Sequence, residues 1–395
     1  MSREVPEGWA DITLGELADI VGGSTPSKAE SAYWEGGNIP WATPSDVTRL
    51  PAGVFELEKT DAHVTKDAVE KTSLRLLPAG SVLMTSRATV GYPVINTVPM
   101  ATNQGFANFL PNPRFDARFL AQWCVHNRPT LERMAGGSTF LEISKRSIRA
   151  IGISLPPLPE QRRIAEILSS VDEAIQTTQA VIDQTRKVKQ GVLARLMTKG
   201  IGHTRFKQTE IGEIPESWSY GKFKDFVFLQ RGFDLPVQSR SSGEIPIYAS
   251  NGVVGTHNQS RISGPTVTTG RSGTLGKVFY YKGGSWPLNT TLYVKDFCNN
   301  DPYFVYWFLR YFRLERFGTG TGVPTLNRNI VHEERVCFPN IHEQRKIAQI
   351  LFGFSTTLDM LREKQVALLN VKVGLMSELL TGRVRVPADL PMAAE

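Results

Sequence analysis

The sequence predicts an α+β protein: two globular α/β domains separated by two long antiparallel coiled-coil helices, related by a pseudo-two-fold internal repeat. Three observations predict this fold. A long segment occurs twice at constant spacing, and a heptad pattern runs through both copies. Short runs of β-forming residues, broken by glycine and proline, precede each copy. We therefore expect the order domain, helix, domain, helix.

The repeat is clearest where each long helix is expected to start. The segment from Pro156 to Leu168 returns as Pro339 to Leu351, a shift of 183 residues that places Glu160 on Glu343. The same ungapped shift carries later residues with it: Lys189, Gly191, Leu196 and Thr198 onto Lys372, Gly374, Leu379 and Thr381. Chance similarity does not hold register over such a length, so the segment is duplicated.

Apolar residues recur inside both copies at alternating steps of three and four, as along the seam of a coiled coil. The first copy carries Ile164, Ile167, Val171, Ala174, Val181, Val188 and Val192 at these positions. The second carries Ile347, Ile350, Phe354, Leu361, Leu368, Val371 and Leu375. Each helix would be about 40 residues and roughly 60 Å long. Because neither is apolar on all sides, each needs a partner helix.

A weaker repeat relates the segments before the helices. Similar stretches are Val5 to Trp9 with Ile214 to Trp218, Ile39 to Trp41 with Ile245 to Ile247, Thr85 to Gly91 with Thr269 to Gly276, and Asn103 to Gly105 with Asn289 to Thr291. Helical stretches at 117–134 and 303–317 close the two domains. The predicted boundaries are 1–157 for the first domain, 158–202 for the central spacer helix, 203–340 for the second domain, 341–384 for the distal spacer helix and 385–395 for a tail.

Composition narrows the function class and the compartment. The formal charge of +7 favours a polyanionic partner, although ribosome-associated and membrane-surface proteins share such an excess. Cys124, Cys298 and Cys337 are too few and too scattered for a disulfide framework or a paired-thiol zinc site. With no secretory signal and no apolar run long enough to cross a bilayer, we expect a cytoplasmic protein with no membrane role.

An antiparallel helix pair would relate the two domains by a pseudo-two-fold axis. Double-stranded DNA has local two-fold symmetry in its backbone, so two related domains could each face one segment of the same duplex. The helix length would then set the distance between the segments. The alternative on geometry alone is a duplicated protein-interaction scaffold without sequence-specific DNA binding.

The chain resembles the specificity subunit of Type I restriction-modification enzymes over essentially its whole length. The resemblance is carried by the two helix-start segments, by Phe206 to Pro215 followed by Trp218, and by Gly318 to Asn329. The chain departs from the repeat pattern at Ser355, which stands where the first copy has Asp172, and at Lys364, which interrupts the second seam.

The resemblance implies two target-recognition domains that each read one half of a bipartite DNA target, with helices that set the gap and dock modification subunits. It implies two modification subunits, which methylate adenine using S-adenosylmethionine, and restriction subunits, which cleave DNA using ATP and magnesium. Those cofactors would belong to the partners, and no cofactor or catalytic activity is expected in this chain by itself. We expect partner contacts at the two helix starts, from Glu160, Gln161, Arg162, Glu343, Gln344 and Arg345.

Motifs of catalysis are incomplete in this chain. Asn38 to Trp41 resembles the loop of amino-methyltransferases, but Ile39 occupies the place of its first proline. Gly273 to Lys277 resembles a phosphate-binding loop, but Arg271 and Val278 replace residues that the loop requires. The six histidines lack metal-ligand spacing. We therefore predict neither a catalytic residue nor a metal site.

Sequence-specific DNA recognition needs hydrogen-bond donors and acceptors from Arg, Asn, Gln, Ser and Thr. Three loops of the first domain offer them: Thr85, Ser86 and Arg87; Asn103 and Gln104; Ser138, Thr139, Lys145 and Arg146. The second domain offers Thr269, Arg271 and Ser272; Asn289 and Thr290; Thr325, Asn327, Arg328 and Asn329. The alternative is that these turn-forming residues shape the domain. Because half-sites usually differ, the divergent stretches Thr48 to Thr72 and Gln238 to Ser263 are also candidates for specificity.

Overall fold

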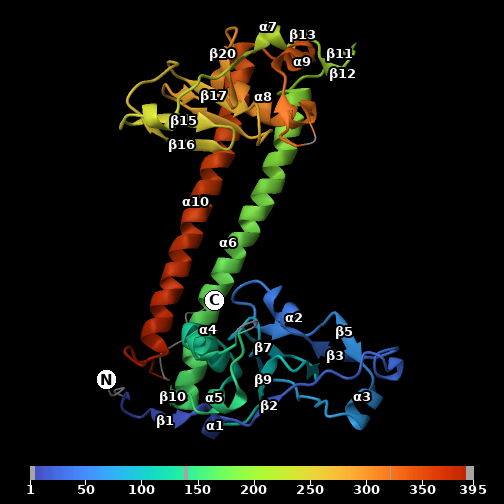
Figure 1. The fold of residues 1–395 in the computed structure, drawn as a ribbon, viewed down its shortest axis with the longest axis vertical. Coiled ribbons are helices and arrows are strands. Elements are labelled where there is room, and N and C mark those ends of the chain that lie inside the picture. The colour runs from blue at the N-terminus through green and yellow to red at the C-terminus, as the bar shows by residue number, and fades with distance from the viewer. Residues whose placement is uncertain (1–4, 138–140, 321, 388–395) are drawn as a thin grey trace. The chain divides into compact units, whose positions relative to one another are not determined.

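The computed structural model describes residues 5–137, 141–320 and 322–387. The chain divides into two compact units: the first unit holds residues 1–180 together with 362–395, and the second holds residues 181–361. Both predicted long helices are present, α6 (Leu158–Lys199) and α10 (Ile341–Leu379). The unit boundary falls within both helices, which are labelled in Figure 1, so each helix contributes one part to each unit.

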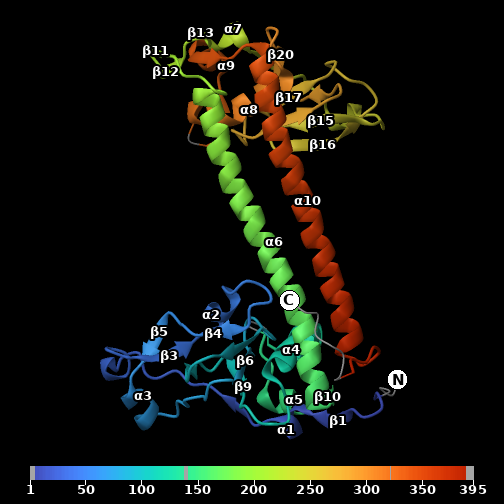
Figure 2. The same cartoon turned by 180° about the vertical axis from the view of Figure 1, so that it is seen from behind.

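The first unit is built on a mixed five-stranded sheet, whose central strands are buried along their whole length. Its order is β2 (Ile20–Gly22), β9 (Phe106–Phe109), β6 (Val82–Thr85), β7 (Pro93–Asn96) and β4 (Glu56–Leu57). A smaller sheet has the order β5 (Ala62–Val64), β3 (Ile39–Ala42) and β8 (Ala101–Thr102). The helix α4 (Ala117–Met134) packs on β6 and β7; α4 and β6 are labelled in Figure 2.

Short elements complete the first unit and lead into α6. The antiparallel pair β1 (Ala10–Thr13) and β10 (Gly152–Leu155) places the N-terminal segment beside the residues that precede α6. The short helices are α1 (Leu14–Leu17), α2 (Pro44–Thr48), α3 (Lys66–Lys71) and α5 (Lys145–Arg149), with a 3-10 turn, η1 (Ser31–Tyr33).

The second unit repeats this architecture with different details. Its larger sheet has the order β14 (Phe228–Arg231), β20 (Thr291–Asp296), β17 (Thr266–Gly270) and β18 (Val278–Tyr281). Its smaller sheet has the order β16 (Gly252–His257), β15 (Ile245–Ala249) and β19 (Trp286–Pro287). The helix α8 (Pro302–Phe312) packs on β17 and β18, as α4 packs on the first sheet.

The remaining pairs of the second unit lie around these sheets. They are β11 (Phe206–Thr209) with β12 (Gly212–Pro215), β13 (Ser219–Lys222) with β23 (Arg335–Phe338), and β21 (Gly318–Thr319) with β22 (Thr325–Leu326). The helical pieces are α7 (Phe223–Phe226), α9 (Arg328–Glu333), η2 (Val237–Ser239) and η3 (Leu314–Phe317). The pair β13–β23 corresponds to β1–β10, which confirms the predicted internal repeat.

Within each unit α6 and α10 run antiparallel. In the first unit Lys372 Nζ donates to Asp172 Oδ1 at 2.6 Å, and Gln365 Nε2 donates to Gln179 Oε1 at 2.8 Å. Seven residues toward the C-terminus of α6 therefore correspond to seven residues toward the N-terminus of α10, as in an antiparallel pair. In the second unit Lys189 Nζ donates to Ser355 Oγ at 2.8 Å. Lys189 and Ser355 are the repeat equivalents of Lys372 and Asp172.

The seam between the helices differs from the predicted apolar pattern. Val181, Val188, Ile350 and Val371 were predicted to face the partner helix, but all four are exposed. The buried residues of α6 include Ile175, Thr178 and Ile182, and those of α10 include Leu351 and Leu358. The prediction was wrong at these four positions because the seam also contains polar side chains such as Asp172, which a count of apolar residues does not include. Lys364 is exposed and so does not interrupt the seam.

Candidate nucleic-acid interface

The start of α6 fastens the helix to the first unit. The Gln161 side chain accepts a hydrogen bond from the Asp116 backbone N–H at 2.8 Å and donates to the Arg114 carbonyl at 3.1 Å. The Glu160 carboxylate accepts from Trp9 Nε1 at 3.1 Å and from Arg385 at 2.8 and 2.9 Å. Burial opposes ionisation of Glu160, but these donors outweigh it and hold its pKa below the ordinary value.

The start of α10 repeats the arrangement in the second unit. The Gln344 side chain accepts from the Asp301 backbone N–H at 2.9 Å. The Glu343 carboxylate accepts from Trp218 Nε1 at 3.2 Å and lies 2.9 Å from His203 Nε2. His203 thus occupies the place that Arg385 occupies in the first unit, so an imidazole replaces a guanidinium.

The helix-start residues predicted to contact partners therefore fall into two sets. Glu160, Gln161, Glu343 and Gln344 are buried, and their side chains bond within the chain. That burial makes them structural links between a domain and a helix, a role that their sequence position alone did not reveal. Arg162 and Arg345 are exposed, and their contact with a partner stays a prediction.

Backbone hydrogen bonds bring the predicted DNA-binding loops of the second unit together. The Arg271 N–H donates to the Thr290 carbonyl at 2.8 Å, and the Leu326 N–H donates to the Arg271 carbonyl at 2.7 Å. The loop after β17 is therefore held between the loop before β20 and the residues before α9. Three segments that are far apart in sequence form one surface.

This surface contains a groove of about 610 Å³, which we call the arginine groove. Five predicted residues line it: Arg271, Thr325, Asn327, Arg328 and Asn329. Gln230 and Arg231 from β14 and Thr319 from β21 also line it, and none of the three was predicted. The repeat gave no signal for Gln230 and Arg231, because the equivalent places of β2 hold Val21 and Gly22, neither of which has a hydrogen-bonding side chain.

The other predicted residues of the second unit lie outside the groove lining. Asn289 donates to the Asp234 carboxylate, while its carbonyl accepts from Arg271 at 3.3 Å. Ser272 and Thr290 are half-buried near the same loops, and Thr269 is fully buried inside β17.

The first unit forms the corresponding surface with different side chains. The Ser86 N–H donates to the Gly105 carbonyl at 2.8 Å, and the Ile143 N–H donates to the Ser86 carbonyl at 2.9 Å. These bonds make Ser86 the equivalent of Arg271. The alignment by sequence, which matched Arg87 with Arg271, is therefore wrong by one residue, because backbone pairing fixes the register and side-chain similarity does not.

The exposed candidates of the first unit are Arg87, Gln104, Lys145 and Arg146, with Asn103 half-buried. Arg87 lies 3.7 Å from the Glu142 carboxylate, and Lys145 begins α5 at the position equivalent to Arg328. Ser138 and Thr139 lie outside the described residues.

Three predicted DNA contacts need correction. Thr85, Ser86 and Thr269 are buried, with relative exposures of 0%, 4% and 1%. The Thr85 hydroxyl bonds to the Thr89 carbonyl and accepts from the Tyr92 N–H at 3.0 Å. Because these side chains present almost no surface, they shape the loops and we remove them from the candidate interface.

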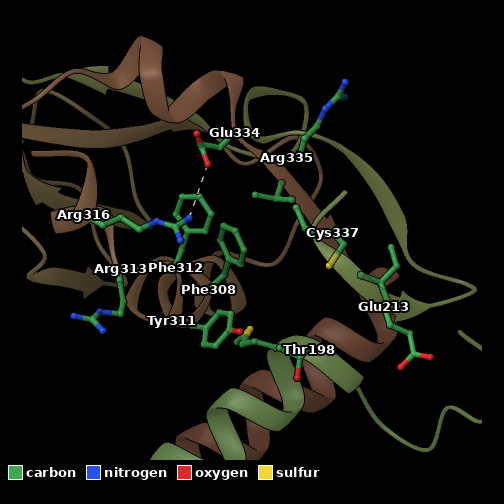
Figure 3. A pocket seen from close by; sticks show the side chains of 14 residues that line it. Thr198, Glu213, Phe308, Tyr311, Phe312, Arg313, Arg316, Glu334, Arg335 and Cys337 are labelled. Atoms are coloured by element: carbon green, nitrogen blue, oxygen red, sulfur yellow. Dashed lines mark ion pairs between the residues drawn. The ribbon is translucent and has the colours of Figure 1, made fainter. Parts of the chain in front are cut away.

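A second cavity of about 720 Å³ lies elsewhere in the second unit, and none of the predicted residues lines it (Figure 3). Phe308, Tyr311 and Phe312 form part of its wall. Its arginines all have carboxylate partners: Arg313 with Glu315 at 3.0 Å, Arg316 with Glu334 at 4.0 Å and Arg335 with Glu210 at 3.8 Å. The arginine groove contains such a pair in Arg231 with Asp234 at 3.5 Å, whereas its Arg271 and Arg328 bond to neutral oxygens. The cavity, with all three arginines paired, is therefore a poorer site for a polyanion than the arginine groove.

Nowhere in the described part of the chain do three or more His, Cys, Asp or Glu side chains gather as metal ligands. Within residues 5–137, 141–320 and 322–387, no helix combines the length and the apolar character needed to cross a bilayer.

Comparison with known proteins adds a family to this geometry. The model of the Type I restriction modification DNA specificity domain matches twice, over residues 6–185 and 215–370. The chain belongs to this family. The two matches begin in the paired segments before Trp9 and Trp218, and each includes the start of a long helix.

Relatives of this family are similar in sequence and in fold. The MjaIX specificity subunit of Methanocaldococcus jannaschii is 30% identical over 59% of this chain, which spans 55% of that subunit. The MjaVIII specificity subunit of the same organism is 27% identical over 97% of this chain and 94% of its own length. A solved structure of an S subunit from M. genitalium superposes with a TM-score of 0.59 at 17% identity, covering 96% of this chain and 97% of that one.

Another solved structure, from work on complex assembly and conformational transition of the type I R-M system, has a TM-score of 0.64 at 14% identity. It covers 96% of this chain and all of its own. The two solved structures support the fold.

Proposed function

We propose that this chain is the DNA sequence-specificity subunit of a Type I restriction-modification complex, in which each unit reads one half of a bipartite target. One observation carries the proposal: in both matches to the DNA specificity family, the same backbone framework presents basic and amide side chains that differ between the units. A shared framework with different side chains suits two half-sites of different sequence. A duplicated protein scaffold without DNA binding is not favoured by this membership.

The proposal includes partners that supply the chemistry. Double-stranded DNA is the substrate, two modification subunits would supply methyl transfer with S-adenosylmethionine, and restriction subunits would supply cleavage with ATP and magnesium. This chain would not itself be an enzyme, and the complex would act in the cytoplasm. In support of a protein partner, α10 exposes Val366, Leu369 and Val373, with relative exposures of 58%, 44% and 67%. At steps of three and four they form one apolar stripe on the helix, which suits a partner helix.

The test is an exchange of recognition segments. We would replace residues 208–338 by the corresponding segment of another specificity subunit and map the methylated sites in cells that express the modification subunit. The expected result is a change in one half of the target, with the other half and the gap retained. A change in both halves would contradict independent readers. If binding by the complex depends on salt but prefers no sequence, the chain is not a specificity subunit.

A further inference from the structure

The arginine groove contains hydrogen-bond donors from three segments of the chain. Arg231 comes from β14, Arg271 from the loop after β17, and Arg328 from the start of α9. None of the described residues that line the groove is acidic, although Arg231 Nη2 lies 3.5 Å from the carboxylate of Asp234, which is outside the lining. The groove therefore favours a ligand that presents several acceptors close together.

The neutral amides of the groove are oriented so that they also donate. Arg328 Nη1 donates to the Gln230 side-chain oxygen and to the Leu229 carbonyl at 3.2 Å. Because a guanidinium can only donate, the Gln230 oxygen must face Arg328, and the amide N–H groups are left for a ligand. The side-chain oxygen of Asn327 likewise accepts a hydrogen bond, from the Asn329 backbone N–H at 3.0 Å, so the Asn327 amide also presents its N–H groups.

Arg328 is held in place by contacts on several sides. Its guanidinium carbon lies 5.7 Å from the centre of the Phe228 ring, in addition to the two hydrogen bonds to β14. Arg328 therefore positions Gln230, and Gln230 with Arg271 presents donors of fixed direction. Such directed donors discriminate between base edges, whereas a phosphate accepts from many directions.

Three donors of the groove have no equivalent in the first unit, although Lys145 there keeps a cation at the position of Arg328. The positions equivalent to Gln230, Arg231 and Arg271 are Val21, Gly22 and Ser86. Both halves of a duplex carry the same sugar-phosphate backbone, so phosphate contacts should be alike in both units. Donors found in one unit alone are those expected to differ with base sequence.

We infer that the arginine groove reads guanine in the half-site of the second unit, through donors from Gln230 and Arg271 to the guanine O6 and N7. In the major groove guanine offers two adjacent acceptors. Adenine offers one acceptor and one donor, and cytosine offers a donor. This inference rests on the proposed function and specifies the chemistry of one of its two readers.

The experiment uses the chain in complex with its modification subunits. Binding would be selected from duplexes in which the half-site of the second unit is randomised, for the wild type and for Gln230→Glu. The substitution keeps the shape of the side chain but replaces the donating amide by a carboxylate. The wild type is expected to select guanine in this half-site. In Q230E the preference for guanine at one position should be about 5- to 150-fold weaker, which is the range for one good base contact.

A chemical probe and a control variant make the result specific. Replacing the selected guanine by 7-deazaguanine, which lacks N7, should weaken wild-type binding about 10-fold or more, and should weaken R271Q binding less. Arg313→Gln, in the other cavity, should retain the wild-type preference. Thermal unfolding of each variant checks that the second unit is folded.

Other outcomes are distinguishable. A wild-type half-site without guanine overturns the inference but leaves the proposed function standing. A uniform loss of affinity for all sequences in R271Q, with a salt slope reduced by about 1, would make the groove a phosphate site and also overturn it. If the wild-type complex prefers no sequence, the proposed function and this inference both fail.

Discussion

At the residue scale the molecule uses the same position for different chemistry in its two units. Arg149 of α5 donates to the Ile20 carbonyl at 2.5 Å. The repeat equivalent of Arg149 is His332 in α9, whose Nε2 accepts from the Leu229 backbone N–H at 3.0 Å. A cation that donates is replaced by a ring that must accept, and an accepting Nε2 requires a neutral imidazole.

The His332 ring makes the stability of the second unit depend on pH. Burial, reinforced by Arg328 and Lys224, lowers the pKa of His332, while Glu333 opposes the shift. In the unfolded chain the imidazole has a pKa near 6.5. At pH values between about 6.5 and the lower pKa of the folded state, the unfolded chain therefore carries a proton on this ring that the folded chain does not. The stabilisation by neutral His332 is therefore complete above about 6.5 and is lost as pH falls through that window.

We predict that His332→Gln reduces this dependence, because the Gln oxygen can still accept from the Leu229 N–H but does not titrate. The free energy of unfolding would be measured by denaturant titration from pH 7.5 down to pH 5. As the pH falls, it should decrease more steeply in the wild type than in H332Q, with a difference in slope of up to about 1.4 kcal/mol per pH unit. His342, which is exposed, gives the control His342→Gln, with an unchanged slope. Equal slopes for the wild type and H332Q would contradict the assignment.

At the element scale the two long helices are joined by polar contacts at equivalent positions. Lys372 and Asp172 form a buried ion pair, with side-chain exposures of 11% and 4%, and Gln122 Nε2 donates to the other Asp172 oxygen at 2.8 Å. In the second unit Ser355 takes the place of Asp172. The contact there with Lys189 is not an ion pair, and Lys189 also lies 4.3 Å from the centre of the Trp307 ring.

We predict that Lys372→Met destabilises the first unit by about 3 kcal/mol or more, because removing one partner leaves the Asp172 charge buried without its cation. Chemical denaturation of the full chain should show an earlier unfolding transition. Lys364→Met on the exposed face of the same helix should change stability by less than about 0.5 kcal/mol. If the two variants behave alike, the buried pair does not stabilise the helix contact.

At the scale of the whole molecule the two units differ in how the chain builds them. The second unit is continuous in sequence, whereas the first combines residues 1–180 with 362–395. Met376, Leu379, Leu380 and Val386 from the later segment are buried in the core that contains Leu14, Phe119 and Trp123. Arg385 from the same segment bonds to Glu160. The first unit therefore depends on residues encoded after the second.

We predict that a chain ending at Leu361 loses the folded first unit and keeps the second, since it lacks four core side chains and the cations that face Asp172 and Glu160. Limited proteolysis should cut this chain within residues 1–180 and leave residues 181–361 resistant. A chain ending at Pro387, which keeps every one of these contacts, should resist cleavage throughout. Equal resistance of both chains would show that the first unit folds without the later segment.

The sequence by itself determined the duplication, the two long helices and the family, because these depend on similarity between positions along one chain. It also identified half of the residues that line the arginine groove, since Arg271 and Arg328 lie in loops rich in polar residues. The tertiary structure decided which of these side chains are exposed. Thr85 and Thr269 are polar, yet their strands are buried along their length.

Only the tertiary structure added Gln230 to the groove and corrected the register between the units. Gln230 lies on β14, far in sequence from Arg271 and Arg328, and reaches them because β14 pairs with β20 and β20 with β17. The equivalence of Ser86 and Arg271 follows from their backbone hydrogen bonds, which do not depend on the identity of the side chain. Strand pairing and burial arise from contacts between distant segments, and these contacts fix the recognition surface.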